Sequence, residues 1–319
     1  MKILVTGAAG QIGFYLIDFL LSKTDHEIFA ASPSYSNQED SRLNKIWLDI
    51  SDFNLTKQVL RDIKPDFIFN FAAITYIPDS YQSPLNVFKV NTGALVNILD
   101  FVKCYLPNCR VFSAGSVDQI EGNSPYAISK RAAADWISFY RNSFNIFCCQ
   151  GLLCNTESPL RSDQFVSKKI AKGAARIALT TEENFIPMEL GNLDSKRDWS
   201  HSEDVVRLVW KAINQDKPED FIFGSGELHS IREFVELAFA AVGLNGQWQG
   251  VGLNEVFRLT DSNKIAAKID KKYFRPDSNK IEKLDTGEAR RVLREVAGPD
   301  AFKSLVFDLV QHEIKNLLK

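Results

Sequence analysis

A tyrosine and a lysine four residues apart are the side chains of this chain best suited to proton transfer. Tyr126 and Lys130 open a segment, YAISKRAAADW, that is typical of a helix. Residues spaced by four lie on the same helical face, so the phenol and the ammonium are predicted to be neighbours. A nearby cation lowers the pKa of a phenol and favours the phenolate, which can accept a proton from an alcohol.

A glycine-rich segment near the N-terminus supplies the context that such a pair needs. TGAAGQIG, from Thr6 to Gly13, follows an apolar run and opens an amphipathic stretch. Glycines between a strand and a helix allow a tight turn and bring a pyrophosphate close to the helix N-terminus. The segment predicts a dinucleotide-binding turn formed by Gly7, Ala9, Gly10, Gln11, Ile12 and Gly13.

The end of the second strand predicts which dinucleotide binds. Many such folds carry an acidic residue there for the ribose 2′-hydroxyl, but this chain has FAASPS. The hydroxyl of Ser32 favours NADP, with NAD as the alternative, and Arg42 is a candidate for the 2′-phosphate or simply a solvated loop charge. Residues at later strand ends and on a following helix complete the predicted cofactor set, which is Asp49, Ile50, Phe71, Ala72, Ala73 and Asn91, together with Tyr126 and Lys130.

The elements that position these residues alternate along the first half of the chain. Apolar runs predict strands at residues 2–6, 27–31, 67–71, 110–113 and 145–149, and amphipathic stretches predict helices near 11–23, 52–63, 86–103 and 126–142. This alternation is typical of a Rossmann-type α/β fold, a doubly wound parallel sheet.

The second half has a less regular pattern. Helices are expected near residues 164–179, 202–215, 230–243, 286–296 and 300–318, whereas residues 245–283 show no clear period. We expect a dinucleotide-binding domain at residues 1–155, to which part of 200–225 returns, and a smaller C-terminal α/β portion at 156–319 that mainly binds substrate.

Composition excludes several other classes of protein. With 45% hydrophobic residues, 24% charged residues and a net charge of −2, the chain has no basic excess typical of a nucleic-acid binder. No apolar stretch approaches the roughly 20 residues of a membrane span, and the short N-terminal run predicts a strand rather than a signal peptide. The five cysteines form no metal or disulfide pattern and are expected to be core residues, so a cytoplasmic location without metal is predicted.

Over nearly its full length the chain resembles the extended short-chain dehydrogenase/reductases, which form the NAD-dependent epimerase/dehydratase superfamily. Within it, the chain most resembles the GDP-mannose 4,6-dehydratases. The segments that carry this resemblance are TGAAGQIGFYLIDFLL, NTESPLR at 155–161, QFVSKKI at 164–170, FRP at 274–276 and, above all, LGNLDSKRDW at 190–199. The resemblance implies that a GDP-sugar is converted to its 4-keto-6-deoxy form by internal hydride transfer and loss of water.

The family pattern also implies individual roles. Ser116 would bind the C4 oxygen of the sugar, Asp118 would be the carboxylate base, Tyr126 the proton acceptor and Lys130 its activator. Arginine suits the diphosphate because its planar fork binds phosphate oxygens in pairs. The implied substrate-binding residues are Thr75, Ser116, Asn155, Lys169, Asn192, Arg197 and Arg275.

The sequence departs from the family pattern at four places. Ser116 and Asp118 replace threonine and glutamate, and the aspartate is shorter by one C–C bond of about 1.5 Å. The stretch between Asp118 and Tyr126 is shorter than in the family, and Asp277 follows Arg275-Pro276 where a glutamate is usual. Residues 32–40 replace an arginine-rich segment that helps to bind NADP and to build a tetramer, so we expect a homodimer through the helices near 86–103 and 126–142.

Two other functions fit part of this pattern. An NADPH-dependent reductase of a GDP-4-keto-6-deoxy sugar, or an epimerase, would need Ser116, Tyr126 and Lys130 but no base at Asp118. A non-catalytic protein that senses the cofactor would need none of these side chains, and the Tyr126–Lys130 pair therefore argues against it.

Overall fold

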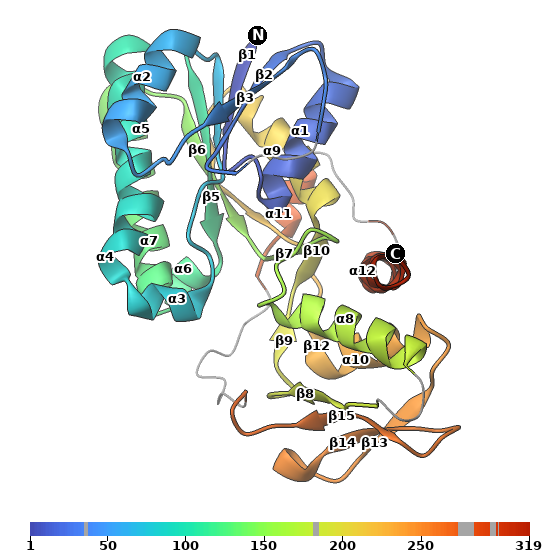
Figure 1. The fold of residues 1–319 in the computed structure, drawn as a ribbon. Helices are drawn as coiled ribbons and strands as arrows, with labels where there is room; N and C mark the ends of the chain where they lie inside the picture. Colours follow the sequence, from blue (N-terminus) through green and yellow to red (C-terminus); the bar gives the residue numbers. More distant parts are fainter. Residues whose placement is uncertain (35–37, 181–184, 274–283, 294–297, 299) are drawn as a thin grey trace. The chain divides into compact units, whose positions relative to one another are not determined.

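The computed structural model describes the chain except for residues 35–37, 181–184, 274–283, 294–297 and 299. It divides into two compact units (Figure 1). Unit 1 consists of Met1–Cys154, Ser202–Gly224 and Asp285–Val296, and unit 2 consists of Asn155–His201, Ser225–Leu284 and Ala297–Lys319.

Unit 1 is built on a seven-stranded parallel sheet of order β11-β6-β5-β4-β1-β2-β3. The strand order reverses between β1 and β4, which is the point at which ligands bind in doubly wound folds. The fold class expected from the sequence is confirmed. The strands are β1 (Lys2–Thr6), β2 (Glu27–Ser32), β3 (Leu43–Trp47), β4 (Phe67–Asn70), β5 (Arg110–Ser116), β6 (Cys148–Leu153) and β11 (Phe221–Phe223).

Helices cover both faces of this sheet (Figure 1). One face packs against α1 (Gln11–Lys23), α9 (Ser202–Ile213) and α11 (Gly287–Leu293), and the other against α2 (Phe53–Ile63), α5 (Ala94–Tyr105) and α7 (Pro125–Phe144). Helices on both sides explain why all four residues of a strand such as β4 are buried, with no alternation of buried and exposed residues. The short elements between them are α3 (Ile77–Gln82), α4 (Pro84–Phe88), η1 (Lys89–Gly93) and α6 (Asp118–Glu121).

The helix expected near residues 86–103 is confirmed as an uninterrupted helical stretch over residues 84–105, which consists of α4, one π-helical turn at η1 and α5. The π-helical turn was not predicted from the sequence. Asn91 lies in this turn, and its side chain bonds to both the N–H and the C=O of Ile74. Side-chain bonding to another segment is invisible in helical periodicity, and π turns of this kind are frequent at functional sites.

Unit 2 has its own core. Three helices, α8 (Val166–Leu179), α10 (Ile231–Ala240) and α12 (Ala301–Leu317), share a buried cluster with a four-stranded sheet of order β13-β14-β15-β8. In this core Trp199 stacks on Phe302, with ring centroids 5.4 Å apart, and packs edge-on against Phe234. The remaining pairs are β7 with β10, which is parallel, and β9 with β12, which is antiparallel.

The strands of unit 2 are short. They are β7 (Asn155–Glu157), β8 (Met188–Leu190), β9 (Lys196–Arg197), β10 (Trp199–His201), β12 (His229–Ser230), β13 (Gly246–Gln249), β14 (Val256–Leu259) and β15 (Ile265–Ile269), with a 3₁₀ turn at η3 (Gly252–Asn254). The described part of the segment 245–283, for which the sequence shows no period, therefore contains three strands. Four residues of alternating burial, as in β13, are too few to be distinguished from a loop.

The expectations for membrane spans and for the cysteines were based on composition. Among the described residues, no helix combines the length and the apolar character needed to cross a membrane. Cys109, Cys148, Cys149 and Cys154 are buried core residues, whereas Cys104 is exposed.

Candidate active site

The turn between β1 and α1 can be formed only by glycine at two positions. Gly7 has a φ of +67°, and a Cβ there would lie 2.6 Å from the Ala72 nitrogen. A Cβ on Gly13 would lie 2.4 Å from the Gly7 carbonyl oxygen. Since real Cβ atoms do not approach backbone so closely, the turn passes directly against the end of β4 and against the first turn of α1.

The N-terminus of α1 faces this turn. Gly10 is its N-cap and provides no side-chain cap, and the first helical turn has no acidic residue. The first N–H groups of a helix lack intrahelical partners and attract anions, so this end can bind a pyrophosphate. Ala9 lies in the turn, and Gln11 and Ile12 begin the helix.

A cavity of about 270 Å³ adjoins the turn at the carboxyl ends of the strands. It brings together seven residues predicted from the sequence, which are Gly7, Gly10, Asp49, Ile50, Phe71, Ala72 and Ala73. The sequence did not single out six other residues of its lining, which are Thr6, Ala31, Pro33, Leu48, Ile74 and Val90. Thr6 donates a hydrogen bond from its hydroxyl to Asn70 Oδ1 at 2.7 Å, so it joins β1 to β4 beneath the cavity.

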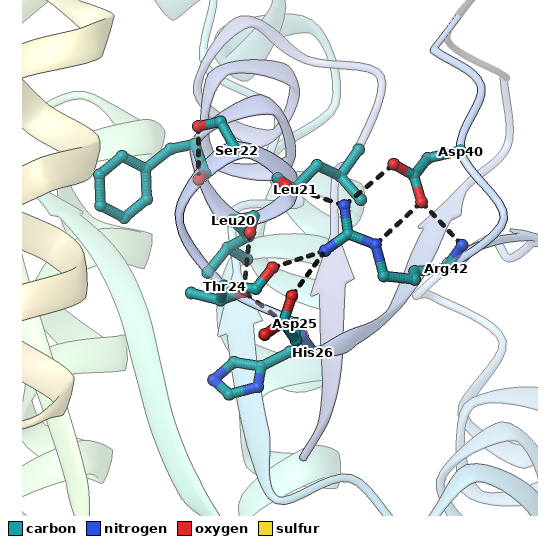
Figure 2. Close-up of polar contacts among 9 residues, drawn as sticks. Leu20, Leu21, Ser22, Thr24, Asp25, His26, Asp40 and Arg42 are labelled. Atoms are coloured by element: carbon teal, nitrogen blue, oxygen red, sulfur yellow. Dashed lines mark hydrogen bonds and ion pairs between the residues drawn. The ribbon is translucent and has the colours of Figure 1, made fainter.

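Arg42 lies away from this edge, which corrects its candidacy for the 2′-phosphate. It immediately precedes β3, at the amino ends of the strands, whereas the cavity lies at their carboxyl ends. Its guanidinium donates to the Leu21 and Thr24 carbonyl oxygens at the end of α1 and to both carboxylate oxygens of Asp40 (Figure 2). These bonds hold the pKa of Asp40 below its ordinary value, and they make Arg42 a cap for α1.

Ser32 is the last residue of β2 and is buried. Its hydroxyl oxygen accepts a hydrogen bond from the Ser34 N–H at 3.3 Å and lies 3.5 Å from the Ser34 hydroxyl. Two hydroxyl groups therefore stand where a dinucleotide fold places its ribose-binding residue.

Asn91 joins the cavity to the helix that carries the tyrosine. Besides its two bonds to Ile74, it donates to the Ser129 hydroxyl at 3.0 Å. Both of its N–H donors are thus used within the protein. The amide holds the segment after β4 against α7, and Thr75 lies exposed in that same segment.

Helix α7 begins in a way that fixes Tyr126 and Lys130. Ser124 caps it by accepting from the Ala127 N–H at 3.1 Å, and Pro125 occupies the first helical position. Both predicted residues are buried, and Lys130 donates from Nζ to the Ala114 carbonyl oxygen of β5 at 2.7 Å. Burial lowers the pKa of Lys130 to about 8, because desolvation disfavours the charged ammonium.

Ser116 and Asp118 meet at the end of β5. The Asp118 N–H donates to the Ser116 hydroxyl oxygen at 3.2 Å, and the hydroxyl lies 3.5 Å from Asp118 Oδ2. Asp118 begins the short helix α6, and both α6 and β5 contact α7. Unit 1 therefore gathers all four predicted catalytic residues on β5, α6 and the start of α7.

The predicted substrate-binding residues of unit 2 lie on several elements. Asn155 begins β7 and donates its N–H to the Asp198 carbonyl oxygen, and Arg197 ends β9. Lys169 on α8 places its ammonium 3.5 Å from the centre of the Tyr273 ring. Asn192 accepts from the Asp194 N–H within the loop after β8, while Arg275 lies outside the described residues.

Two carboxylates in the segments 155–161 and 190–199 stabilise the fold of unit 2. Asp198 accepts hydrogen bonds from the Ser225 N–H, the Ser225 hydroxyl and the Gly226 N–H, at 2.6–2.7 Å. Glu157 is buried, with Ser167 donating to it at 2.7 Å and Arg161 3.2 Å away, and burial raises its pKa. Part of the sequence likeness in these segments thus reflects structural support.

Comparison with known proteins identifies the family. A family model described as GDP-mannose 4,6 dehydratase matches residues 4–294. The chain belongs to the GDP-mannose 4,6-dehydratase family. It is 32% identical to a family protein of Cricetulus griseus, over 98% of this chain and 91% of that protein, and 29% identical to one of Vibrio cholerae, over 92% and 88%. The resemblance stated from the sequence is confirmed.

Solved structures agree with this family at the level of the fold. UDP-glucose 4-epimerase of Thermotoga maritima has a TM-score of 0.81 at 18% identity and covers 99% of this chain and 100% of its own. The dTDP-glucose 4,6-dehydratase of Bacillus anthracis, solved with NAD, has a TM-score of 0.79 at 18% identity and covers 99% and 97%. RMD of Pseudomonas aeruginosa, solved with NADPH, has a TM-score of 0.77 at 17% identity and covers 99% of each chain.

Proposed function

We propose that the protein is a GDP-mannose 4,6-dehydratase or acts on a closely related GDP-hexose, and that it produces the 4-keto-6-deoxy sugar. The observation that carries this proposal is the cluster in unit 1. A hydroxyl and a carboxylate meet at the end of β5, and a phenol and a desolvated ammonium lie at the start of α7, which packs against β5 and α6. The family of the chain is named for this reaction.

The residues of unit 1 fit a nicotinamide dinucleotide. The backbone crossing at Gly7 and Gly13 leaves no room for a Cβ, and α1 presents an uncapped N-terminus to the turn. Gly7, Gly10, Ala72 and Ala73 would line the dinucleotide, and Lys130 would bind beside the nicotinamide. When bound, this cofactor supplies reversible hydride acceptance, which the side chains of the protein cannot provide.

Three side chains serve the oxidation at C4. The Ser116 hydroxyl binds the C4 oxygen, and the Tyr126 phenolate accepts the proton of the C4 hydroxyl as the C4 hydride departs. Lys130 favours the phenolate electrostatically while its ammonium is charged. Its pKa of about 8 leaves the ammonium mostly protonated at neutral pH.

Asp118 serves the loss of water. The new C4 ketone acidifies the C5 proton, and the Asp118 carboxylate removes it and then delivers a proton to the departing C6 hydroxyl. The hydride taken from C4 returns to C6, and Tyr126 returns its proton to the sugar, where C5 needs one. A carboxyl group that accepts and then donates a proton is sufficient for this elimination.

For the substrate we propose that Thr75, Asn155, Lys169, Asn192, Arg197 and Arg275 contribute to binding the GDP-sugar. The resemblance assigns the diphosphate to Asn155, Arg197 and Arg275, with Lys169 and Asn192 nearby. Arginine and lysine are suited to a diphosphate through charge-assisted hydrogen bonds.

Between the two cofactors we propose weak selection, with NADP and NAD both accepted. The Ser32 and Ser34 hydroxyls can bond to a ribose 2′-hydroxyl or to a 2′-phosphate. Residues 32–41, SPSYSNQEDS, contain no lysine or arginine for the phosphate, and Arg42 is bound elsewhere. Titration of the purified protein with each cofactor is expected to give Kd values within about tenfold, and a preference of 10³ or more for NADP would contradict this proposal.

We also propose that the chain forms a homodimer through α4 and α7. Exposed apolar side chains gather there, namely Leu85 and Phe88 on α4 and Ile128, Trp136 and Phe139 on α7. The spacing of the three α7 residues places them on one helical face. Sedimentation is expected to give a dimer for the wild type and a monomer for Phe139→Glu, and a wild-type monomer at micromolar concentration would contradict it.

Mass spectrometry of the purified protein with GDP-mannose and catalytic NADP tests the proposed reaction. We expect a product lighter by one water without accumulation of NADPH. If turnover requires a GDP-4-keto-6-deoxy sugar and stoichiometric NADPH, the protein is a reductase and the proposal is wrong.

A further inference from the structure

Two buried glutamines lie directly behind the catalytic serine. Gln119 of α6 and Gln150 of β6 are 6% and 2% exposed. The Gln119 side-chain oxygen accepts a hydrogen bond from the Ser116 N–H at 3.1 Å, and its nitrogen donates to the Gln150 side-chain oxygen at 2.9 Å. A continuous chain of amides thus connects the backbone of Ser116 to a neighbouring strand of the sheet.

Gly115 provides the space for this pair. A Cβ at that position would lie 2.6 Å from Gln150 Cδ and 2.9 Å from Gln119 Oε1. The two amides therefore pack against the backbone of β5 at the residue just before Ser116.

The rest of the loop is fixed from α7. Arg131, the residue after Lys130, donates to the Gln119 carbonyl oxygen at 2.9 Å and to the Gly122 carbonyl oxygen at 3.2 Å. Gln150 is itself anchored, because its N–H donates to Asp220 at 2.6 Å, and Asp220 pairs with Arg141 of α7. The loop 116–122 is therefore held both from the sheet and from the helix that carries Tyr126.

We propose that Gln119 is a positioning residue for the reaction, which holds Ser116 and Asp118 in register through the Ser116 N–H and is itself held by Gln150. This inference rests on the proposed function. The backbone N–H of Asp118 donates to the Ser116 hydroxyl oxygen, so a shift of Ser116 moves the base as well. A displacement of about 1 Å in a catalytic group can cost about 10²-fold in rate.

One feature of the pair suggests a conservative variant. Gln150 Nε2 is buried and has no hydrogen-bond partner among the described residues, which is costly for a buried donor. A glutamate at position 119 keeps an oxygen for the Ser116 N–H and offers a second oxygen to Gln150 Nε2 after rotation of that amide. Gln119→Glu should therefore preserve the position of Ser116, whereas Gln119→Leu should not.

The first test compares these two variants in steady-state dehydration of GDP-mannose. Gln119→Leu is expected to lower kcat by about 10- to 100-fold, while the KM for GDP-mannose and the Kd for NADP change less than about threefold. Gln119→Glu is expected to recover kcat to within about threefold of wild type. Equal kcat values for Gln119→Leu and wild type would overturn the positioning role.

The double variant Gln119→Leu/Gln150→Leu separates positioning from stability. Each single leucine leaves the other amide buried and unsatisfied, but the double variant removes both, so Tm should recover. The Ser116 N–H still lacks its acceptor, so kcat should stay low. Recovery of kcat together with Tm would show that the glutamines serve stability alone.

Asn97→Leu is the matched control. Asn97 of α5 is also a buried amide of unit 1, and it donates one hydrogen bond to the carbonyl oxygen of Phe53 in α2 at 3.1 Å. This variant should lower Tm without lowering kcat. A loss of kcat as large as that of Gln119→Leu would attribute the effect to destabilisation and overturn the inference.

Hydrogen exchange at the Ser116 amide tests the contact without any turnover. The wild type should protect this amide, and Gln119→Leu should increase its exchange rate by at least about tenfold, while Gln119→Glu should not. If the wild type protects the amide but does not dehydrate GDP-mannose, the proposed function fails and the contact stands. If the amide exchanges equally fast in both proteins, the positioning contact is wrong whatever the activity.

Discussion

The turn of residues 7–13 and the loop of residues 116–122 lie at the ends of two strands of one sheet, but they are held in different ways. The turn depends on backbone, since Gly7 and Gly13 leave no space for any side chain. The loop depends on side chains from other elements, above all Gln150 of β6 and Arg131 of α7. The first kind of site is encoded by the spacing of a few residues, and the second kind by contacts between segments that are distant in sequence.

The largest effect on kcat is expected from a substitution of Asp118, the carboxylate of the loop. Asp118→Asn keeps the shape of the side chain but cannot accept the C5 proton. We expect kcat for dehydration to fall by about 10²- to 10⁴-fold, with NADP affinity unchanged because the turn is untouched. Steady-state kinetics and a cofactor titration measure the two quantities.

Asp118→Glu is the matched variant, since it restores the residue that the family pattern has at this position. Its kcat should stay far above that of Asp118→Asn. Unchanged turnover in Asp118→Asn would remove Asp118 from the mechanism and favour a reductase.

A substitution in the turn of residues 7–13 should mainly weaken the binding of NADP. In Gly7→Ala the new Cβ meets the backbone of Ala72 at 2.6 Å, in a left-handed conformation. We expect the Kd for NADP to rise by at least about tenfold and Tm to fall, since the left-handed conformation alone costs an alanine about 1–2 kcal/mol. Gly243→Ala is the control, because Gly243 also has a positive φ, of +74°, but has nothing near its Cβ position. Equal losses of Tm in both variants, with NADP affinity retained, would contradict the steric account of the turn.

Lys130 bonds to the Ala114 carbonyl oxygen of β5, the strand that leads into the loop, and the cost of burying its ammonium should be measurable as a pH dependence of stability. Burial lowers its pKa from 10.5 to about 8, so in this pH window the folded protein binds fewer protons than the unfolded chain. The free energy of unfolding of wild type should therefore rise relative to Lys130→Met as pH increases through the window, by about 3 kcal/mol in all. Urea unfolding of both proteins measures the difference, and parallel curves would mean that the ammonium is not desolvated.

The smallest effect should come from Arg42, which lies at the opposite edge of the sheet from the turn. Arg42→Gln removes the guanidinium that caps α1 and pairs with Asp40. We expect a slight decrease of Tm, and Kd values for NADP and NAD that each stay within about twofold of wild type. A selective loss of NADP affinity would show that Arg42 does bind the 2′-phosphate.

The features that could be predicted from the sequence are those that depend on local residue patterns. The helix at residues 11–23 was predicted with the bounds of α1, because a glycine turn and an apolar face mark its start and its period. The π-helical turn at Asn91 was not predicted, because the Asn91 side chain bonds to Ile74, in another segment. Tyr126 and Lys130 follow from a local spacing in the same way as the glycines do.

The contacts that hold Ser116 and Asp118 could not be predicted from the sequence. Gln119 and Gln150 are ordinary polar residues in sequence, and only the parallel pairing of β5 with β6 brings them together. For Arg42 a local pattern was misleading. Its place in the sequence suggested a ligand for the 2′-phosphate, but β3 runs parallel to β2, so Arg42 lies at the amino ends of the strands. Local patterns predicted which residues are candidates for the reaction, but long-range contacts determine how they are held.

The central claim is that hydride leaves C4 and returns to C6 of one sugar, and deuterium labelling tests it most directly. GDP-mannose carrying deuterium at C4 should be incubated with the protein and unlabelled catalytic NADP, and the product should be examined by mass spectrometry and NMR. The account predicts a product that has lost one water, retains the deuterium and carries it at C6. A product that has lost the deuterium, or no product until a 4-keto sugar and NADPH are supplied, would contradict it.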